Sequence, residues 1–267
     1  MKKRIDYLAR SEEEALLLRH IADKVRALEE QHYLQIGPFL SPSERALVCR
    51  LMAYRDAPRI AWQGGYPEAR RQLPVFLPDY LPDDFLDTTP EECPLAIVRC
   101  TPPRLEHPAH KDYLGALIGL GLSRRVLGDI LVHETGADCI VKKEHASFIA
   151  EQFDRAGRIP IRCECITDLH LLHVPEESWT TEDVILSSLR LDTYVATVFR
   201  CGRNKAQSYI TQGHVMLNDL PADKITRTVH PDDVVSLRRH GRTVFQDIVG
   251  KSRKENLIIR ILRYPYR

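Results

Sequence analysis

The side chains best suited to bind a polyanion lie between residues 190 and 218. Arginine and lysine neutralise phosphate charge, and serine, glutamine and histidine add hydrogen bonds. A rigid surface with this mixture is typical of a nucleic-acid contact, and it favours recognition of RNA shape over base sequence. The candidate RNA-binding residues are Arg200, Arg203, Lys205, Gln207, Ser208, Gln212 and His214.

Two short helices are predicted to position these side chains. Asp192 is expected to cap the first helix, in which Val195 and Val198 follow at helical spacing. The second helix is expected to begin at Arg203 and to end at Gly213. Its inward face is predicted to hold Ala206, Tyr209 and Ile210, and its opposite face Lys205, Ser208 and Gln212.

The residues after the helix pair are predicted to form a small antiparallel sheet. Residues 215–217 alternate as in a strand, and Asn218-Asp219 is expected to form the turn that follows. Residues 232–249 read as a hairpin that turns at His240-Gly241, and residues 255–264 as a closing strand. This tail is expected to supply the sheet of the same small domain.

Residues 190–218 resemble the RNA-binding domain named after ribosomal small-subunit protein four. They share its R-L-D start, its basic second helix and its I-x-x-G-x-V-x-L-N ending. The chain departs from the pattern at Gly202, where serine is usual, and at Asp232 and Arg239, where glycine is usual. The resemblance implies two helices on a small sheet, with the helices contacting RNA.

The distribution of charge supports the same region. The chain has 267 residues and a formal net charge of +1, which alone neither favours nor excludes nucleic acid. Residues 181–267, however, hold 15 Lys and Arg against 9 Asp and Glu, whereas residues 57–180 hold 13 against 19. The basic charge therefore lies in the part that carries the candidate residues.

The remaining pattern predicts an α+β protein with three domains. Residues 1–56 read as a small helical domain, with capping boxes at Ser11 and Ser41. Residues 57–180 alternate strands and helices, and residues 181–267 form the third domain. The stretch from Pro175 through Glu177 is expected to be the linker.

Nearly the whole chain resembles the YlmH family of bacterial proteins, in GGYPEARR (64–71), in residues 110–132 and in the position of the last domain. The resemblance is most specific at residues 110–132 and 190–218. The resemblance implies a central RNA-recognition-like α+β domain. It also implies a cytoplasmic, ribosome-associated factor that binds ribosomal RNA and tRNA on large subunits with stalled peptidyl-tRNA, with a reported link to cell division. No membrane contact and no small-molecule cofactor are expected.

The central domain offers secondary candidates for RNA contact, namely His110, Lys111, Arg124 and Arg125. Ser123 is expected to cap a helix that starts with the two arginines and directs its N-terminal amides towards a phosphate. Ordinary charges at the ends of surface helices account for these four residues equally well.

Catalytic interpretations are weaker. Residues 190–193 resemble the catalytic-aspartate stretch of pseudouridine synthases, but here they begin the RNA-binding domain. The glycines between Gly115 and Gly121 could suggest a methyltransferase loop, yet no convincing strand precedes them. His170 and His173 have ligand-like spacing without a third ligand nearby in sequence. We therefore expect no enzyme and no metal, with an RNA-modifying enzyme and a scaffold for division proteins as alternatives.

The seven cysteines and the first residues are consistent with a reducing compartment. No C-x-x-C pair occurs, so buried free thiols are a simpler reading than a zinc site. The opening MKKRIDYLARSEEE is basic but lacks the apolar run of a signal peptide. These features predict a cytoplasmic protein.

Overall fold

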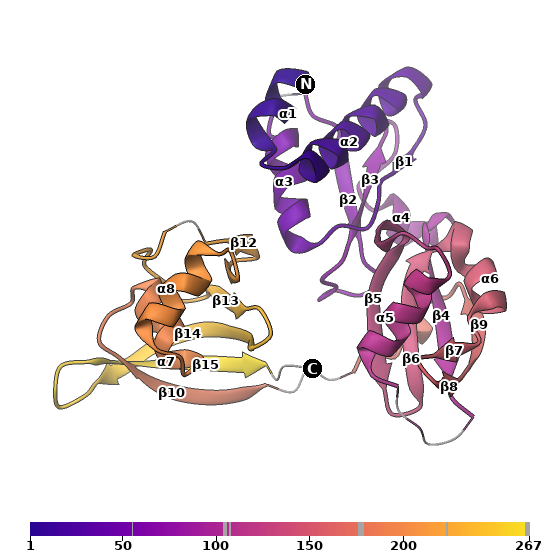
Figure 1. Cartoon of the computed structure of the whole chain (residues 1–267). Coiled ribbons are helices and arrows are strands. Elements are labelled where there is room, and N and C mark those ends of the chain that lie inside the picture. Colours follow the sequence, from indigo (N-terminus) through magenta and orange to yellow (C-terminus); the bar gives the residue numbers. More distant parts are fainter. Residues whose placement is uncertain (55, 104–105, 107, 176–178, 223, 265–267) are drawn as a thin grey trace. The chain divides into compact units, whose positions relative to one another are not determined.

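The protein consists of two compact units, Met1–Pro175 and Glu176–Arg267. The computed structural model describes residues 1–54, 56–103, 106, 108–175, 179–222 and 224–264 (Figure 1). Both units combine helices with antiparallel sheets, so the predicted α+β class is confirmed. The division between the units falls inside the predicted linker, whose residues 176 and 177 lie outside the described residues.

The first unit begins with three helices packed on a small sheet. Ser41 and Glu44 form the predicted capping box, in which each side chain accepts the backbone N–H of the other residue. Ser11 also caps its helix, but Glu14 accepts the N–H of Arg10 and so does not complete a box. The elements are α1 (Lys2–Leu8), α2 (Glu12–Gln31), α3 (Pro42–Met52), β1 (Gln35–Ile36), β2 (Arg59–Gln63) and β3 (Leu73–Leu77).

The small sheet takes its strands from both sides of residue 56. Strand β3 lies between β1 and β2, and its Phe76 is buried in the same core as the three helices. Leu28 and Leu51 belong to this core, and Ile60 of β2 packs against it. The domain boundary after residue 56 stays a prediction.

A four-stranded antiparallel sheet in the order β5-β6-β4-β9 forms the rest of this unit. Tyr113 and Ile149 of its two longer helices are buried against one face. Ile140 on the other face packs with Phe39 and Val75 of the first part. The elements are α4 (Phe85–Thr88), β4 (Leu95–Thr101), α5 (His110–Gly119), β5 (Leu127–His133), β6 (Gly136–Lys142), α6 (Lys143–Gln152), β7 (Arg155–Ala156), β8 (Ile159–Pro160), β9 (Arg162–Ile166) and the 3-10 turns Pro90–Glu92, Arg124–Val126 and Leu169–Leu171.

The second unit is a six-stranded antiparallel sheet with a helix pair on one face (Figure 1). The strands follow the order β10-β15-β14-β13-β11-β12. The predicted turn is present, since Asn218 and Asp219 have φ values of 51° and 61°. The elements are β10 (Thr180–Leu186), α7 (Leu191–Val198), α8 (Arg203–Thr211), β11 (Val215–Leu217), β12 (Leu220–Pro221), β13 (Val234–Leu237), β14 (Gly241–Lys251) and β15 (Leu257–Tyr264).

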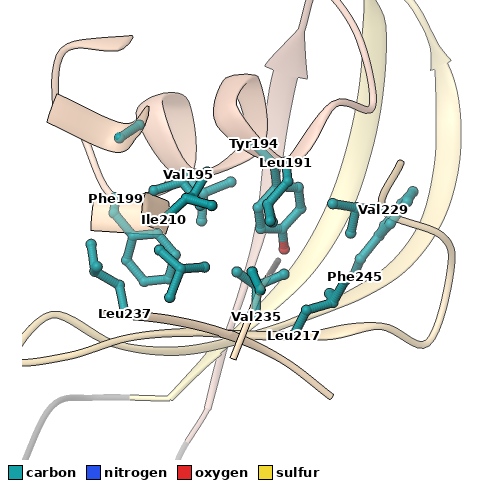
Figure 2. Packing of buried hydrophobic residues seen from close by; sticks show 14 of the residues in the cluster. Leu191, Tyr194, Val195, Phe199, Ile210, Leu217, Val229, Val235, Leu237 and Phe245 are labelled. Carbon is teal, nitrogen blue, oxygen red and sulfur yellow. The ribbon is translucent and has the colours of Figure 1, made fainter. Parts of the chain in front are cut away.

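One hydrophobic core fixes the helix pair to this sheet (Figure 2). Tyr194 and Val195 of α7 and Ile210 of α8 are buried between the helices and the strands. The Tyr194 hydroxyl lies 3.1 Å from the Thr243 hydroxyl, so this buried polar group has a partner. Burial raises the pKa of Tyr194 to about 12. The backbone that carries the candidate residues is therefore held rigidly.

Candidate nucleic-acid interface

The first helix of the pair begins differently from the prediction. Arg190 occupies the N-cap position, and its side chain makes no capping hydrogen bond. Asp192 lies inside the first turn of α7, where it is fully buried. The prediction that Asp192 caps the helix is therefore wrong. A buried carboxylate needs hydrogen-bond donors, and the surrounding structure supplies them.

Asp192 is the centre of a network that joins both helices. Its carboxylate accepts two hydrogen bonds from the Arg190 guanidinium, both 3.0 Å long. The Arg203 Nε and the Gln207 amide donate to the same Asp192 oxygen, each at a distance of 3.1 Å. The Thr193 N–H completes the set at 3.0 Å. The Arg190 guanidinium contributes most to holding the pKa of the Asp192 carboxyl far below its usual range, and Gln207 and Arg203 reinforce the effect.

This network orients two of the predicted contact residues. Arg203 keeps 57% of its side chain exposed although its Nε is bound to Asp192. The remaining guanidinium nitrogens of Arg203 can therefore face a ligand in a fixed orientation. Gln207 is half-buried and its amide nitrogen is occupied by Asp192. Arg190, which sequence reasoning did not include, belongs to the same edge.

The outward face of α8 matches the prediction. Lys205, Ser208 and Gln212 are all exposed, and the Gln212 amide donates to the Ser208 hydroxyl over 3.1 Å. Arg200, in the connection before α8, is also exposed and adopts a left-handed backbone with φ of 51°. We call Arg190, Arg200, Arg203, Lys205, Gln207, Ser208, Gln212 and His214 the helix-pair surface.

An aromatic group borders the helix-pair surface. The Tyr209 ring lies 6.0 Å from the His214 ring and 5.7 Å from the His240 ring, measured between centroids. The Lys205 ammonium lies 5.7 Å from the Tyr209 ring centre. His214 is half-buried in this group, so it is less available than predicted. His240 was missed because it comes from the distant β13–β14 turn, which carries no local signal for this contact.

The secondary candidates of the first unit are only partly arranged as predicted. Arg124 and Arg125 belong to a single 3-10 turn, in which the Ser123 hydroxyl accepts the Arg125 N–H. The expected helix is therefore absent at this place, and its N-terminal amide site with it. Arg125 forms an ion pair with Glu44 at 3.4 Å, and burial lowers the pKa of Arg124.

The other two secondary candidates lie at the first turn of α5. His110 and Lys111 are both exposed there. Partial desolvation of the imidazole, followed by the nearby charge of Arg124, lowers the pKa of His110. Since a neutral histidine contributes no charge, Lys111 is the stronger phosphate ligand of the two.

The segment GGYPEARR (64–71) has a structural role. Asp129 of β5 accepts the Arg70 N–H at 2.7 Å and the Tyr66 hydroxyl at 2.9 Å. The Arg71 guanidinium donates to the carbonyl groups of Phe39, Arg124 and Leu127. Burial is the main reason that the pKa of Arg71 falls to about 10. This loop therefore ties the first part of the unit to the four-stranded sheet.

One polar cluster of the first unit was not foreseen. Ligand atoms of His133, Asp138 and His173 lie within 4.8 Å of one another. Arg99, however, binds both oxygens of the buried Asp138 carboxylate at 2.8 and 2.9 Å. A guanidinium in this position opposes a metal cation, so we assign no metal to the cluster. His170, the other histidine of the ligand-like pair, is not a member.

Comparison with known proteins identifies both modules. Residues 95–168 match the family described as a putative RNA-binding domain in YlmH, and residues 189–235 match the S4 domain. The ribosome-associated protein quality control protein P2 of Bacillus subtilis is 32% identical over 234 residues. The alignment covers 86% of this chain and 87% of that relative. The chain belongs to the YlmH family.

Membership of the YlmH family confirms the resemblance drawn from the sequence. A solved structure, the cell division protein ylmH from Streptococcus pneumoniae, matches with a TM-score of 0.48 and 21% identity. The structural match covers 62% of this chain and 98% of the S. pneumoniae chain. None of the helices formed by the described residues combines the length and the apolar character needed to cross a membrane.

Proposed function

We propose that this YlmH-family protein is a ribosome-associated RNA-binding factor that docks through the helix-pair surface. The observation that carries the proposal is the network at Asp192, which fixes Arg190 and Arg203 beside the exposed face of α8. Preorganised cations lose little side-chain freedom on binding phosphate, so such a surface binds a rigid RNA backbone well. The S4-domain match and the name of the B. subtilis relative support this assignment.

The finer part of the proposal concerns the target. We propose that the protein binds ribosomal RNA and tRNA on large subunits that carry stalled peptidyl-tRNA, in the cytoplasm. The relative is named for ribosome-associated protein quality control, which is compatible with this target. Because the helix-pair surface offers mostly cations and amides, it suits the sugar–phosphate backbone of folded RNA.

A second contact is proposed on the first unit. Lys111 at the start of α5 is exposed, and Arg124, Arg125 and His110 lie in the same part of the fold. The match of residues 95–168 to a putative RNA-binding domain supports a role for this region. Since Arg125 is already paired with Glu44, we expect its contribution to be smaller than that of Lys111.

Charge reversal at Arg200 and Lys205 tests the main surface. Arg203 is left intact because it holds Asp192, and its reversal would place a second carboxylate beside a buried one. The double variant Arg200→Glu/Lys205→Glu is expected to reduce affinity for large subunits by about tenfold or more, since charged hydrogen bonds are lost. Co-sedimentation at several salt concentrations gives the affinity and its salt dependence.

The matched control is Arg253→Glu/Lys254→Glu, which makes the same charge change at two exposed residues between β14 and β15. This control is expected to bind more tightly than the helix-pair variant. Its binding should also keep the steeper salt dependence, because it retains the phosphate contacts. Equal binding by both folded variants would contradict the proposed surface.

An enzymatic role is not required by this arrangement. Asp192, the residue that resembles a catalytic aspartate, is fully buried and its oxygens are occupied by four neighbouring residues. A general base must reach its substrate within hydrogen-bond distance, which this carboxylate cannot do without breaking the network. Mass spectrometry of RNA from a deletion strain would detect a modification activity located elsewhere in the chain.

A further inference from the structure

The second unit has another surface on the face of its sheet that the helix pair leaves uncovered. Alternate residues of a strand point to opposite faces, and Phe245, Ile259 and Ile261 point into the core under the helices. Their sequence neighbours therefore point to the opposite face. Among these neighbours, Val244 and Leu262 are only partly buried, as expected for a face without a covering layer.

The strand register places an aromatic and basic row across this face. Arg242 of β14 is paired with Tyr264 of β15 on one side and with Ser236 of β13 on the other. Trp179 directly precedes Thr180, whose partner is Arg263, so Trp179 falls opposite Tyr264. We call Trp179, Tyr264 and Arg242 the aromatic row.

The distances within the aromatic row confirm this placement. The rings of Trp179 and Tyr264 have centroids 6.1 Å apart and planes inclined by 54°. The Arg242 guanidinium lies 5.5 Å from the Tyr264 ring centre, within the range of a cation–π contact. Arg242 Nε is buried and has no hydrogen-bond partner in the described part of the chain, so it is the rest of the guanidinium that a ligand can reach.

Trp179 is exposed although its ring is large and apolar. It is 51% exposed, whereas the neighbouring apolar residues Val244 and Leu262 on the same face are half-buried. Exposed tryptophan next to tyrosine and arginine gives flat π surfaces beside a positive charge. Nucleic-acid bases stack on both kinds of plane irrespective of base identity.

We propose that the aromatic row binds unpaired nucleotides of RNA by stacking, as a second RNA site of this unit. The proposal rests on the proposed function and adds a class of ligand to it. Residues 181–267 have a net charge of +6, and the row itself contains a guanidinium. Both features favour a polyanionic ligand over an uncharged apolar one. The acidic residues of this face, Asp183 and Asp247, lie beyond the next row, where Asp183 is bound to Arg260.

The position of the row explains why the ligand should be single-stranded. The helix pair and the aromatic row lie on opposite faces of one sheet. A rigid RNA helix that binds the helix pair therefore cannot reach the aromatic row as well. Bases inside a duplex are also stacked on each other and cannot offer a free plane to Trp179. A flexible unpaired segment meets both conditions.

Tryptophan fluorescence tests the proposal in the full-length protein. The chain has two tryptophans, and the variant Trp62→Phe leaves Trp179 as the single reporter. A single-stranded oligouridylate is expected to quench this fluorescence with saturation, whereas an RNA duplex of equal length is not. The converse variant Trp179→Phe, which reports Trp62, should show no quenching.

Affinities measured by anisotropy of a labelled oligouridylate provide the second readout. Trp179→Ala and Arg242→Ala are each expected to weaken binding about 5- to 100-fold, the range typical of losing one stacked base. Ile185→Ala is the matched control. Ile185 is 54% exposed and, by strand alternation through Thr181, lies on the same face as Trp179 but outside the aromatic row. It should bind like the unchanged protein.

The outcomes separate this proposal from the helix-pair surface. If Arg200→Glu/Lys205→Glu loses large-subunit binding but keeps saturable quenching of Trp179, two sites are present. Absence of quenching, equal quenching by the duplex, or equal affinity of Trp179→Ala and Ile185→Ala would overturn the aromatic row. Loss of ribosome binding by Trp179→Ala with unchanged oligouridylate affinity would also overturn it, in favour of a protein contact.

Discussion

At the scale of single residues, Asp192 shows how one side chain organises a surface. Its short distance in sequence to Arg190 permits an ion pair, but the contacts with Arg203 and Gln207 require α8 to pack against α7. An aspartate before a helical segment is usually read as a cap, which is the interpretation that failed here. Burial converts the same carboxylate into the anchor of two arginines.

Replacing Asp192 by asparagine is expected to destabilise the second unit by about 1–3 kcal/mol near neutral pH, because charged hydrogen bonds become neutral or unpaired. The folded pKa of Asp192 lies below its unfolded value, which is about 3.9 for an aspartate. Its stabilisation is therefore complete above that unfolded value and is lost as the pH falls towards the folded pKa. The stability difference from the unchanged protein should shrink in acid.

Urea denaturation at neutral pH and at acidic pH measures this difference. Asp183→Asn is the control, since Asp183 pairs with Arg260 on the exposed face of the sheet and is expected to matter little for stability. A constant effect of Asp192→Asn across the pH range would show that the charge of Asp192 is not what stabilises the unit.

At the scale of elements, two turns of the second unit place non-glycine residues in a left-handed backbone. The family pattern has glycine at the positions of Asp232 and Arg239, and both residues have left-handed backbones with φ values of 69° and 66°. Glycine adopts this region without a steric cost, whereas a side chain there is strained. Asp232 and Arg239 therefore carry side chains at positions where the backbone favours glycine.

Arg239→Gly is accordingly expected to stabilise the second unit by up to about 1 kcal/mol, after the larger chain entropy of glycine in the unfolded state is subtracted. Arg238→Gly removes the same charge at a neighbouring position outside the left-handed region, and it should destabilise or have no effect. Hydrogen exchange of the β13 and β14 amides measures the change in unfolding free energy for each of the two variants. Stabilisation by both substitutions would point to charge, not backbone strain.

At the scale of the whole molecule, the two units each have their own hydrophobic cores. Among the described residues, the core of the helix pair and six-stranded sheet is formed by residues of the second unit, and the other three cores by residues of the first. A local loss of stability is therefore expected to remain within one unit. Such proteins unfold in separate steps.

Ser41→Ala tests this independence. The Ser41 hydroxyl accepts the Glu44 N–H at the start of α3, and loss of an N-cap costs about 1 kcal/mol. Hydrogen exchange read by mass spectrometry should report faster opening of α3 and β3, with α7 and β15 unchanged. Equal acceleration in both units would mean that they unfold together.

The sequence by itself determined the helix pair, the Asn218-Asp219 turn, the closing strand and the family. These features depend on residues within a few positions of each other, where helical spacing and turn chemistry apply directly. The tertiary structure alone decided that Asp192 binds Arg203, that Arg239 adopts a left-handed backbone, and that Trp179, Arg242 and Tyr264 form one row. Helix packing and strand register bring distant residues together, and neither leaves a local pattern in the chain.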